Sequence, residues 1–315
     1  MPGSSRGNWP KVAIGALVLI NLVLFALLGL RQPTEVVRAK PATSPADTTR
    51  SPRSSPTPPG TAGDSTPTES ASNAGRSTRM LAVASDTLAW RAVFGPCPGG
   101  SDLEVSRDGG RTWRAAKSGL KAVSRLRAYG DSGVFAVGGA TDCESRYVAT
   151  DGPGKSWTTY DRLLGETWYR VPKGPNRVHA PGGRISQPCG EKLRDFAGLG
   201  DLGAAALCAD GTVRTTQDSG QSWRDLRGVS TALSLGTDGQ VYAVAMRREG
   251  CDGVALAVLD PGAEEIDRDR VRCAPAEGSE SDEVAVGVRE QVVWLWLGDE
   301  VKVSTNRGRT WDRSS

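Results

Sequence analysis

The sequence predicts an all-β fold, a β-propeller of four-stranded blades, preceded by one transmembrane helix and a disordered linker. Three observations predict this organisation. An apolar run lies near the N-terminus, a stretch without aromatic residues follows it, and a short motif then recurs through the rest of the chain. The shortest interval between motif tryptophans is 44 residues, with strand-like runs between them, which is typical of propeller blades.

The apolar run covers residues 12–30, where only Asn21 is polar. At about 1.5 Å per residue, a helix of this length crosses a bilayer core of about 30 Å. No small-residue cleavage site follows the run, so we expect an uncleaved anchor behind a cytoplasmic segment, residues 1–11. The six cysteines of the remaining chain favour an oxidising exterior. We therefore expect a single-pass protein of the cell membrane, with its N-terminus inside and its propeller outside.

Residues 31–78 form the predicted linker. They contain eight of the 19 prolines and no Phe, Trp or Tyr. Such a stretch cannot bury enough apolar surface to offset the entropy of the chain, so we expect it to be disordered. Its role is to hold the domain of residues 79–315 away from the membrane. The sequence leaves open whether the Ser/Thr-Pro clusters are glycosylated.

The charge and histidine content exclude several function classes. Eight of the 39 basic residues and four of the 36 acidic ones precede Arg79, so the predicted domain is close to neutral. A neutral domain gives no electrostatic reason to expect a nucleic-acid partner. The single histidine, His179, rules out a zinc site of the His-pair type. We expect no cofactor, no metal site and no catalytic residue.

The motif reads Ser/Thr-x-Asp-x-Gly-x-Ser/Thr-Trp and occurs at residues 106–113, 150–157, 216–223 and 304–311. In the second copy the Asp lies one residue early, and in the fourth it is Asn. Such a pattern suits a hairpin turn, because the carboxylate or amide accepts hydrogen bonds from backbone N–H groups, the Gly takes a positive φ and the Trp packs as an apolar plug. Its structural residues are Ser106, Asp108, Gly110, Trp113, Asp151, Gly154, Trp157, Asp218, Gly220, Trp223, Asn306, Gly308 and Trp311.

These four segments resemble the Asp boxes of the bacterial neuraminidase repeat propellers. That family includes sialidases, sortilin-type receptors and assembly factors of photosystem II. The resemblance implies a propeller fold, and it implies that the boxes help the blades to fold instead of binding a ligand. It does not imply an activity.

The spacing of the motifs favours five blades. The motif tryptophans are separated by 44, 66 and 88 residues, which leaves one blade without a motif and one insertion, at about residues 162–185. The blades are expected to begin near Met80, Lys121, Lys192, Val229 and Asp282. Six or seven blades are less favoured, because the length of the domain divided by the period gives about five. The insertion is expected to extend the second blade.

The six cysteines are expected on one face of the propeller. Cys97, Cys143 and Cys208 precede their motif tryptophans by 16, 14 and 15 residues, which places them near the turn between the second and third strands. Cys251 and Cys273 flank Gly262 symmetrically, as partners in one hairpin would. This favours a Cys251–Cys273 disulfide. Of the three pairings of the other four cysteines, we favour Cys97–Cys143 with Cys189–Cys208.

Two classes of function remain. The first is a non-enzymatic binding or assembly module with an unknown protein or glycan ligand, bound on the cysteine face and the insertion. Trp168, Tyr169 and His179 of the insertion are the candidate binding residues, because exposed aromatic side chains are common interface anchors.

The second class is a glycoside hydrolase of the sialidase type. The family resemblance would then imply three arginines on a substrate carboxylate, a Tyr nucleophile with its Glu partner, and an acid/base Asp. The Arg-Ile-Pro segment usual in that family is absent, and the only Arg-Ile pair, Arg184-Ile185, lies in the insertion. Convergence of three arginines on the central funnel would favour this second class.

Overall fold

The computed structural model describes residues 78–95, 97–276 and 283–313. Within these ranges it contains no helix that is long and apolar enough to span a membrane. The expected cytoplasmic segment, the expected transmembrane helix and residues 31–77 of the expected linker lie outside the described residues.

Six antiparallel sheets form the blades of a propeller, and five of them contain four strands in sequential order. The first blade is made of β1 (Arg79–Val83), β2 (Ala89–Val93), β3 (Leu103–Ser106) and β4 (Arg114–Ala115). The second is made of β5 (Ala122–Tyr129), β6 (Gly133–Gly139), β7 (Ser145–Thr150) and β8 (Thr158–Thr159).

The last three blades have the same strand order as the first two. The fourth comprises β12 (Leu193–Leu199), β13 (Gly203–Cys208), β14 (Val213–Thr216) and β15 (Arg224–Asp225). The fifth comprises β16 (Thr231–Thr237), β17 (Tyr242–Arg247), β18 (Gly253–Leu259) and β19 (Arg272–Pro275), with a short 3-10 helix, η2 (Arg268–Arg270), before β19. The sixth comprises β20 (Val284–Arg289), β21 (Val292–Leu297), β22 (Glu300–Ser304) and β23 (Asp312–Arg313).

The third blade is the one that the sequence analysis missed. Residues 162–185, expected as an extension of the second blade, instead contribute to a separate sheet. After the 3-10 helix η1 (Asp161–Glu166), this three-stranded sheet consists of β9 (Tyr169–Val171), β10 (Gly174–His179) and β11 (Ile185–Ser186). The expectation of five blades is therefore wrong, and the propeller has six. The third blade has no motif of its own, so the spacing of the tryptophans could not reveal it.

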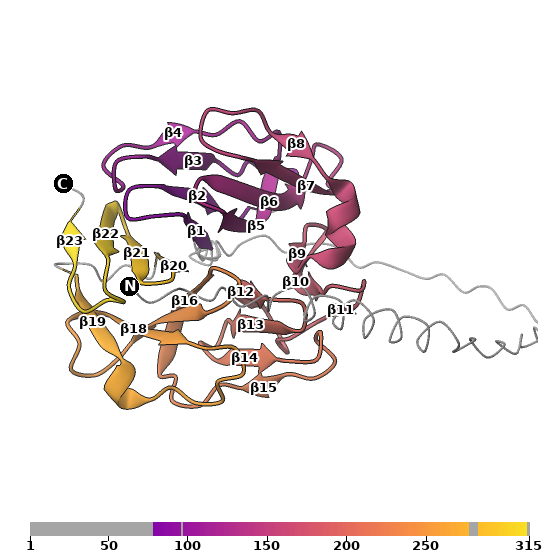
Figure 1. Ribbon diagram of the computed structural model, residues 1–315. Coiled ribbons are helices and arrows are strands. Elements are labelled where there is room, and N and C mark those ends of the chain that lie inside the picture. Colours follow the sequence, from indigo (N-terminus) through magenta and orange to yellow (C-terminus); the bar gives the residue numbers. More distant parts are fainter. Residues whose placement is uncertain (1–77, 96, 277–282, 314–315) are drawn as a thin grey trace, which may run out of the picture. The chain divides into compact units, whose positions relative to one another are not determined.

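The blades close into a ring around their first strands. β1 packs against β20 and β5, β16 packs against β12 and β20, and β9 contacts both β5 and β12 (Figure 1). The second strands of the second and fourth blades form a packed layer inside their blades, because every residue of β6 and β13 is buried. The ring is closed between its last and first blades by side chains, such as the indole N–H of Trp294, which donates to the Ser85 carbonyl at 2.9 Å.

Three of the four motif turns share one hydrogen-bond pattern. The Ser or Thr hydroxyl accepts from the N–H of the motif glycine at 2.8 Å, 3.1 Å and 2.8 Å, in the pairs Ser106–Gly110, Thr216–Gly220 and Ser304–Gly308. The carboxylate or amide oxygen accepts from the N–H four residues later at 2.9 Å, 3.0 Å and 2.9 Å, in the pairs Asp108–Thr112, Asp218–Ser222 and Asn306–Thr310. The hydroxyl and the carboxylate or amide of each motif therefore stabilise the turn between the third and fourth strands of the blade.

The second copy, residues 150–157, departs from this pattern for a backbone reason. In the three regular turns the residue before the motif glycine also has a positive φ: +76° at Gly109, +55° at Ser219 and +56° at Arg307. The second copy has Pro153 at this position, and the proline ring holds φ near −65°. Asp151 accordingly accepts a hydrogen bond from the Tyr129 hydroxyl at 3.1 Å.

The regular turns predict a specific acid sensitivity. Hydrogen bonds from the Thr112 side chain and backbone lower the pKa of Asp108 to about 2, and those from Ser222 hold the pKa of Asp218 below its usual value. A carboxylate with a lowered pKa in the folded state contributes stability above its unfolded pKa of about 3.9, and that stability is lost as the pH falls through the folded pKa. We expect the double variant Asp108→Asn/Asp218→Asn to lose less stability than wild type between about pH 4 and pH 2.

Asn306 serves as the natural precedent for this substitution, because its amide makes the same turn and its Nδ2 donates to the Thr310 hydroxyl at 2.8 Å. Near pH 7 the double variant should therefore unfold at a urea concentration close to that of wild type. Urea denaturation at a series of pH values measures both quantities. Parallel acid profiles for the two proteins would show that these carboxylates do not control the acid sensitivity.

Candidate functional site

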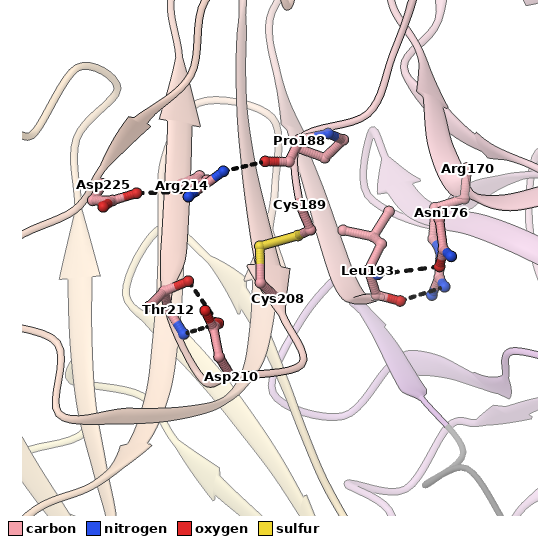
Figure 2. The surroundings of a disulfide bond; sticks show 10 residues. All are labelled: Arg170, Asn176, Pro188, Cys189, Leu193, Cys208, Asp210, Thr212, Arg214 and Asp225. Atoms are coloured by element: carbon pink, nitrogen blue, oxygen red, sulfur yellow. Dashed lines mark hydrogen bonds and ion pairs between the residues drawn. A yellow bond between two sulfur atoms is a disulfide. The ribbon is translucent and has the colours of Figure 1, made fainter. Parts of the chain in front are cut away.

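The three disulfides lie on the face of the ring opposite the motif turns. Cys97–Cys143, Cys189–Cys208 and Cys251–Cys273 have Cα–Cα distances of 5.7, 5.6 and 5.6 Å. These are the three pairs that the sequence favoured. The first joins the loops between the second and third strands of the first two blades, the second joins the third blade to the fourth (Figure 2), and the third lies within the fifth blade.

The aromatic residues that were expected to be exposed are part of the core. Trp168 is 1% exposed and Tyr169 is 7% exposed. Trp168 packs against Phe196 and Trp223 at ring-centroid distances of 5.9 and 6.5 Å. The expectation that Trp168 and Tyr169 are exposed interface anchors is therefore wrong. They fill the space around the third blade.

His179 is a packing residue in the same part of the fold. Its ring stacks on Tyr169 at 4.6 Å, and its Nδ1 lies 3.0 Å from the Thr167 carbonyl. Among the described residues, no group of three or more His, Cys, Asp or Glu side chains is arranged to hold a metal ion.

Two buried arginines hold the third blade: Arg170 lies on its own strand β9, and Arg125 lies on β5 of the neighbouring blade. Arg125 of β5 donates to the carbonyls of Trp168 and Gly198 at 2.9 and 3.2 Å. Arg170 of β9 donates to the carbonyl of Leu193 at 2.9 Å, as Figure 2 shows. Trp168 precedes β9 and lies near the end of β12, whereas Arg170 lies near the start of β12. β9 therefore runs antiparallel to β12, unlike the first strand of a regular blade.

A pocket of about 310 Å³ opens beside Arg125, on the face that carries the motif turns. We call it the arginine pocket. Its inner wall contains Arg125, Arg127, Phe135 and Tyr147, and its outer wall contains Glu166, Asp201 and Asp238. Asp201 comes from the turn between the first and second strands of the fourth blade, and Asp238 comes from the same turn of the fifth blade. The volume lies at the lower end of the range for small-molecule sites.

Two arginines and two aromatic rings form the inner wall. Phe135 and Tyr147 stack at 4.8 Å with an interplanar angle of 15°. The guanidinium carbons of Arg125 and Arg127 lie 5.6 and 5.2 Å from the centre of the Phe135 ring. These distances are within the range of cation–π attraction. The inner wall therefore combines two positive charges with a flat aromatic surface.

Two glycines make room for these arginines. A Cβ on Gly198 would lie 2.0 Å from Nη1 of Arg125, and a Cβ on Gly239 would lie 2.3 Å from Nη1 of Arg127. Gly239 also has a φ of +93°, which other residues rarely adopt. The chain thus has no side chain at the two positions where one would displace a guanidinium group.

Burial sets the electrostatics of the inner wall. Loss of hydration lowers the pKa of Arg125 to about 9, and the neighbouring Arg127 lowers it further. Burial likewise lowers the pKa of Arg127. Both guanidinium groups are charged, because arginine is not deprotonated in proteins at neutral pH. Burial also raises the pKa of Tyr147, so its phenol is neutral. The inner wall consequently carries two like charges in a poorly solvated place.

A three-arginine clamp does not form in this pocket. Within the described residues the pocket is lined by only two arginines, Arg125 and Arg127. The third buried arginine, Arg170, donates to the carbonyls of Pro175, Leu193 and Arg194 on the opposite side of the third blade. Glu166 lines the pocket, but Tyr169 stacks on His179 away from it. Among the described residues that line this pocket, the three arginines of a sialidase-type clamp do not converge.

The fold and the pocket define a six-bladed β-propeller with a pocket on one face, which has two arginines on its inner wall and three carboxylates on its outer wall. No family model matches the sequence, and no curated protein matches it. Solved structures of similar fold include YCF48 bound to D1 peptide, at 16% identity over 76% of this chain and 81% of that one, with a TM-score of 0.29.

Two further similar structures differ in function from YCF48. One is the Aleuria aurantia lectin in complex with alpha-methyl-L-fucoside, at 12% identity over 76% of this chain and 95% of that one, with a TM-score of 0.41. The other is the GH74 xyloglucanase from Xanthomonas campestris, at 15% identity over 74% and 38%, with a TM-score of 0.30. At these identities and TM-scores, the similarity concerns the fold and does not indicate which of these functions this protein has.

Proposed function

We propose that the protein is a non-enzymatic binding module, anchored in the cell membrane by residues 12–30 and displayed outside the cell. The observation that carries the binding function is the arginine pocket, which has two arginines on its inner wall and is built on strands that disulfide-linked blades hold in place. A rigid site loses little conformational entropy when a ligand binds. The ligand is a protein or a glycan, and nucleic acid is not proposed.

The regular motif turns support a further assignment within this proposal, to the Asp-box propellers. Each turn uses the hydroxyl of its first residue and the carboxylate or amide of its third to bind its own backbone. Because those polar groups are bonded internally, the turns are proposed to stabilise blades and not to contact the ligand. This moves the proposed binding site from the cysteine face to the pocket between the turns.

The proposed topology predicts a simple protection pattern. We expect a protease added to intact cells to release fragments from residues 79–315, because the Pro/Ser/Thr-rich linker offers the accessible cleavage sites. Immunoblotting of the medium with an antibody against the propeller measures the release. A propeller that is degraded only after lysis would place the domain inside the cell and contradict the proposal.

The binding function is tested by comparing two arginine variants in intact cells. Arg127→Met removes one charge from the pocket, whereas Arg111→Met removes an exposed charge from the motif turn of the first blade. Crosslinking should yield the same adducts from wild type and Arg111→Met, and these adducts should be lost from Arg127→Met. Adducts that depend on Arg111 and not on Arg127 would locate the binding site on the turns.

A further inference from the structure

The two arginines of the pocket have no carboxylate partner. Arg125 is 8% exposed and donates hydrogen bonds to two backbone carbonyls, while its Nε has no acceptor. Within the described part of the chain, Arg127 makes no hydrogen bond or ion pair, and its Nε is buried without an acceptor. A buried charge is costly unless an opposite charge compensates it. The inner wall therefore carries two positive charges that no carboxylate of the described residues pairs with.

The nearest carboxylate of the outer wall is already occupied. Asp238 accepts hydrogen bonds from the N–H groups of Gln240 and Val241 at 2.8 and 2.9 Å, and from that of Glu290 at 3.3 Å. These bonds fix the turn before β17, so the carboxylate cannot turn toward Arg127 without breaking them. Asp238 raises the pKa of Arg127 through its charge, without a hydrogen bond between the two side chains.

The remaining acidic residues lie at the entrance. Glu166 and Asp201 line the pocket but are exposed, so they are hydrated where the arginines are not. A ligand that entered would meet two negative charges first and two positive charges further in. This order favours a ligand with one small anionic group and disfavours one that carries several negative charges, which the entrance would repel.

We propose that the arginine pocket binds one carboxylate group of the protein or glycan ligand, and that a carboxylate beside an ammonium group is favoured over a pair of carboxylates. A guanidinium group matches the two oxygens of a carboxylate, and charge-assisted hydrogen bonds of this kind are stronger than neutral ones. The terminal Nη atoms of Arg127, which have no acceptor among the described residues, are the donors that such a group would reach, and Arg125 adds its charge behind them. An ammonium group on the same ligand is attracted by Glu166 and Asp201. This inference rests on the proposed binding function and names the chemistry of the ligand.

The test uses the purified full-length protein in detergent and three probes of one resonance each: acetate, glycine and succinate. Saturation-transfer-difference NMR at constant ionic strength measures their affinities. We expect saturable binding of glycine and acetate, with glycine binding more tightly, and weaker binding of succinate. If succinate binds most tightly, the carboxylates at the entrance do not repel a second negative charge, which contradicts the proposal. If no probe shows saturable binding, the proposal is wrong.

Variants assign the binding to the pocket. Arg127→Met should weaken the binding of acetate and glycine at least about tenfold, which is about 1.4 kcal/mol, and Arg127→Lys should retain part of it. Arg111→Met, in the first blade, should bind all probes as wild type does. The double variant Glu166→Gln/Asp201→Asn should bind succinate more tightly than wild type and lose the preference for glycine. Circular dichroism confirms that each variant is folded.

The outcomes separate this inference from the proposed function. If Arg127→Met loses the probes but keeps the crosslinked partner, the pocket binds carboxylates and the partner binds elsewhere on the propeller. If Arg127→Met keeps the probes, the carboxylate proposal is wrong, whatever the crosslinking shows. Equal affinities of Arg127→Met and Arg127→Lys for acetate would likewise contradict a role for the positive charge.

Discussion

Replacement of Trp168 by alanine is expected to lower the free energy of unfolding by about 3–5 kcal/mol, the usual cost of removing a buried large side chain. Trp168 is among the largest fully buried side chains, and its ring contacts Phe196 of β12 and Trp223 of the motif turn in the fourth blade. The loss would be a large part of a typical domain stability of about 5–15 kcal/mol. Urea denaturation followed by tryptophan fluorescence measures it.

Trp157 provides the matched control, because it is a motif tryptophan in the irregular second turn and is only half-buried. Its replacement by alanine should cost about 1–2 kcal/mol, within the ordinary range for point variants. The motif tryptophans were expected to be buried plugs, but all four are partly exposed. Equal losses for Trp168→Ala and Trp157→Ala would mean that the third blade does not depend on the indole that it covers.

Local signals in the sequence were sufficient to predict five of the six blades. The motif turns are local, since a hydroxyl and a carboxylate within five residues determine their geometry, as at Ser106 and Asp108. The pairing of Cys251 with Cys273 follows from one hairpin in the same way. The first strands of the blades begin within about two residues of the positions expected from the sequence, for example at Ala122 and Leu193.

The third blade was missed because its stability comes from residues distant in the sequence. β9 has three residues and β11 has two, and no motif turn connects them. The blade is instead held by Arg125, which lies 43 residues from its acceptor at Trp168. The two arginines in the sequence of β5, Arg125 and Arg127, were a signal, because an arginine on a buried strand requires partners.

The arginine pocket could not be predicted for a similar reason. Its walls come from β5, β6 and β7 of one blade, from η1 and its following residues, and from turns of two other blades. Sequence spacing does not reveal such an arrangement. Gly198 and Gly239 each leave the space that a guanidinium group occupies, but a glycine in a strand or turn has many explanations when it is seen in a sequence alone.

Replacement of Arg170 by leucine is the second change with a large expected effect. Its guanidinium is buried, lies 3.7 Å above the ring of Phe94, and donates to the carbonyls of Leu193, Arg194 and Pro175. Leucine fills part of the space but removes the charged donor from the carbonyls of Leu193 and Pro175, whereas the Arg194 carbonyl keeps the Thr78 hydroxyl as a donor. We expect a loss of about 3–5 kcal/mol, the usual effect of removing one member of a buried charged network.

Arg177→Leu is the control for this change, since Arg177 lies on the adjacent strand β10 and is exposed. An exposed substitution of this kind should change the stability by about 0.5 kcal/mol or less. Urea denaturation of the two variants and wild type at pH 7 makes the comparison. A difference between the variants of less than about 1 kcal/mol would show that the edge of β12 does not need the guanidinium.

The loss caused by Arg170→Leu should also depend on pH, through Asp195. Burial raises the pKa of this carboxyl to about 6, while hydrogen bonds from Leu235 and Phe196 and the charge of Arg170 oppose the shift. A carboxyl with a raised folded pKa contributes stability that is present below its unfolded pKa and is lost as the pH rises through the folded value. Without Arg170 the pKa of Asp195 rises further, so ionisation of Asp195 costs more. The variant should therefore lose more stability relative to wild type at pH 8 than at pH 5, and an equal loss at both values would show that the two charges do not interact.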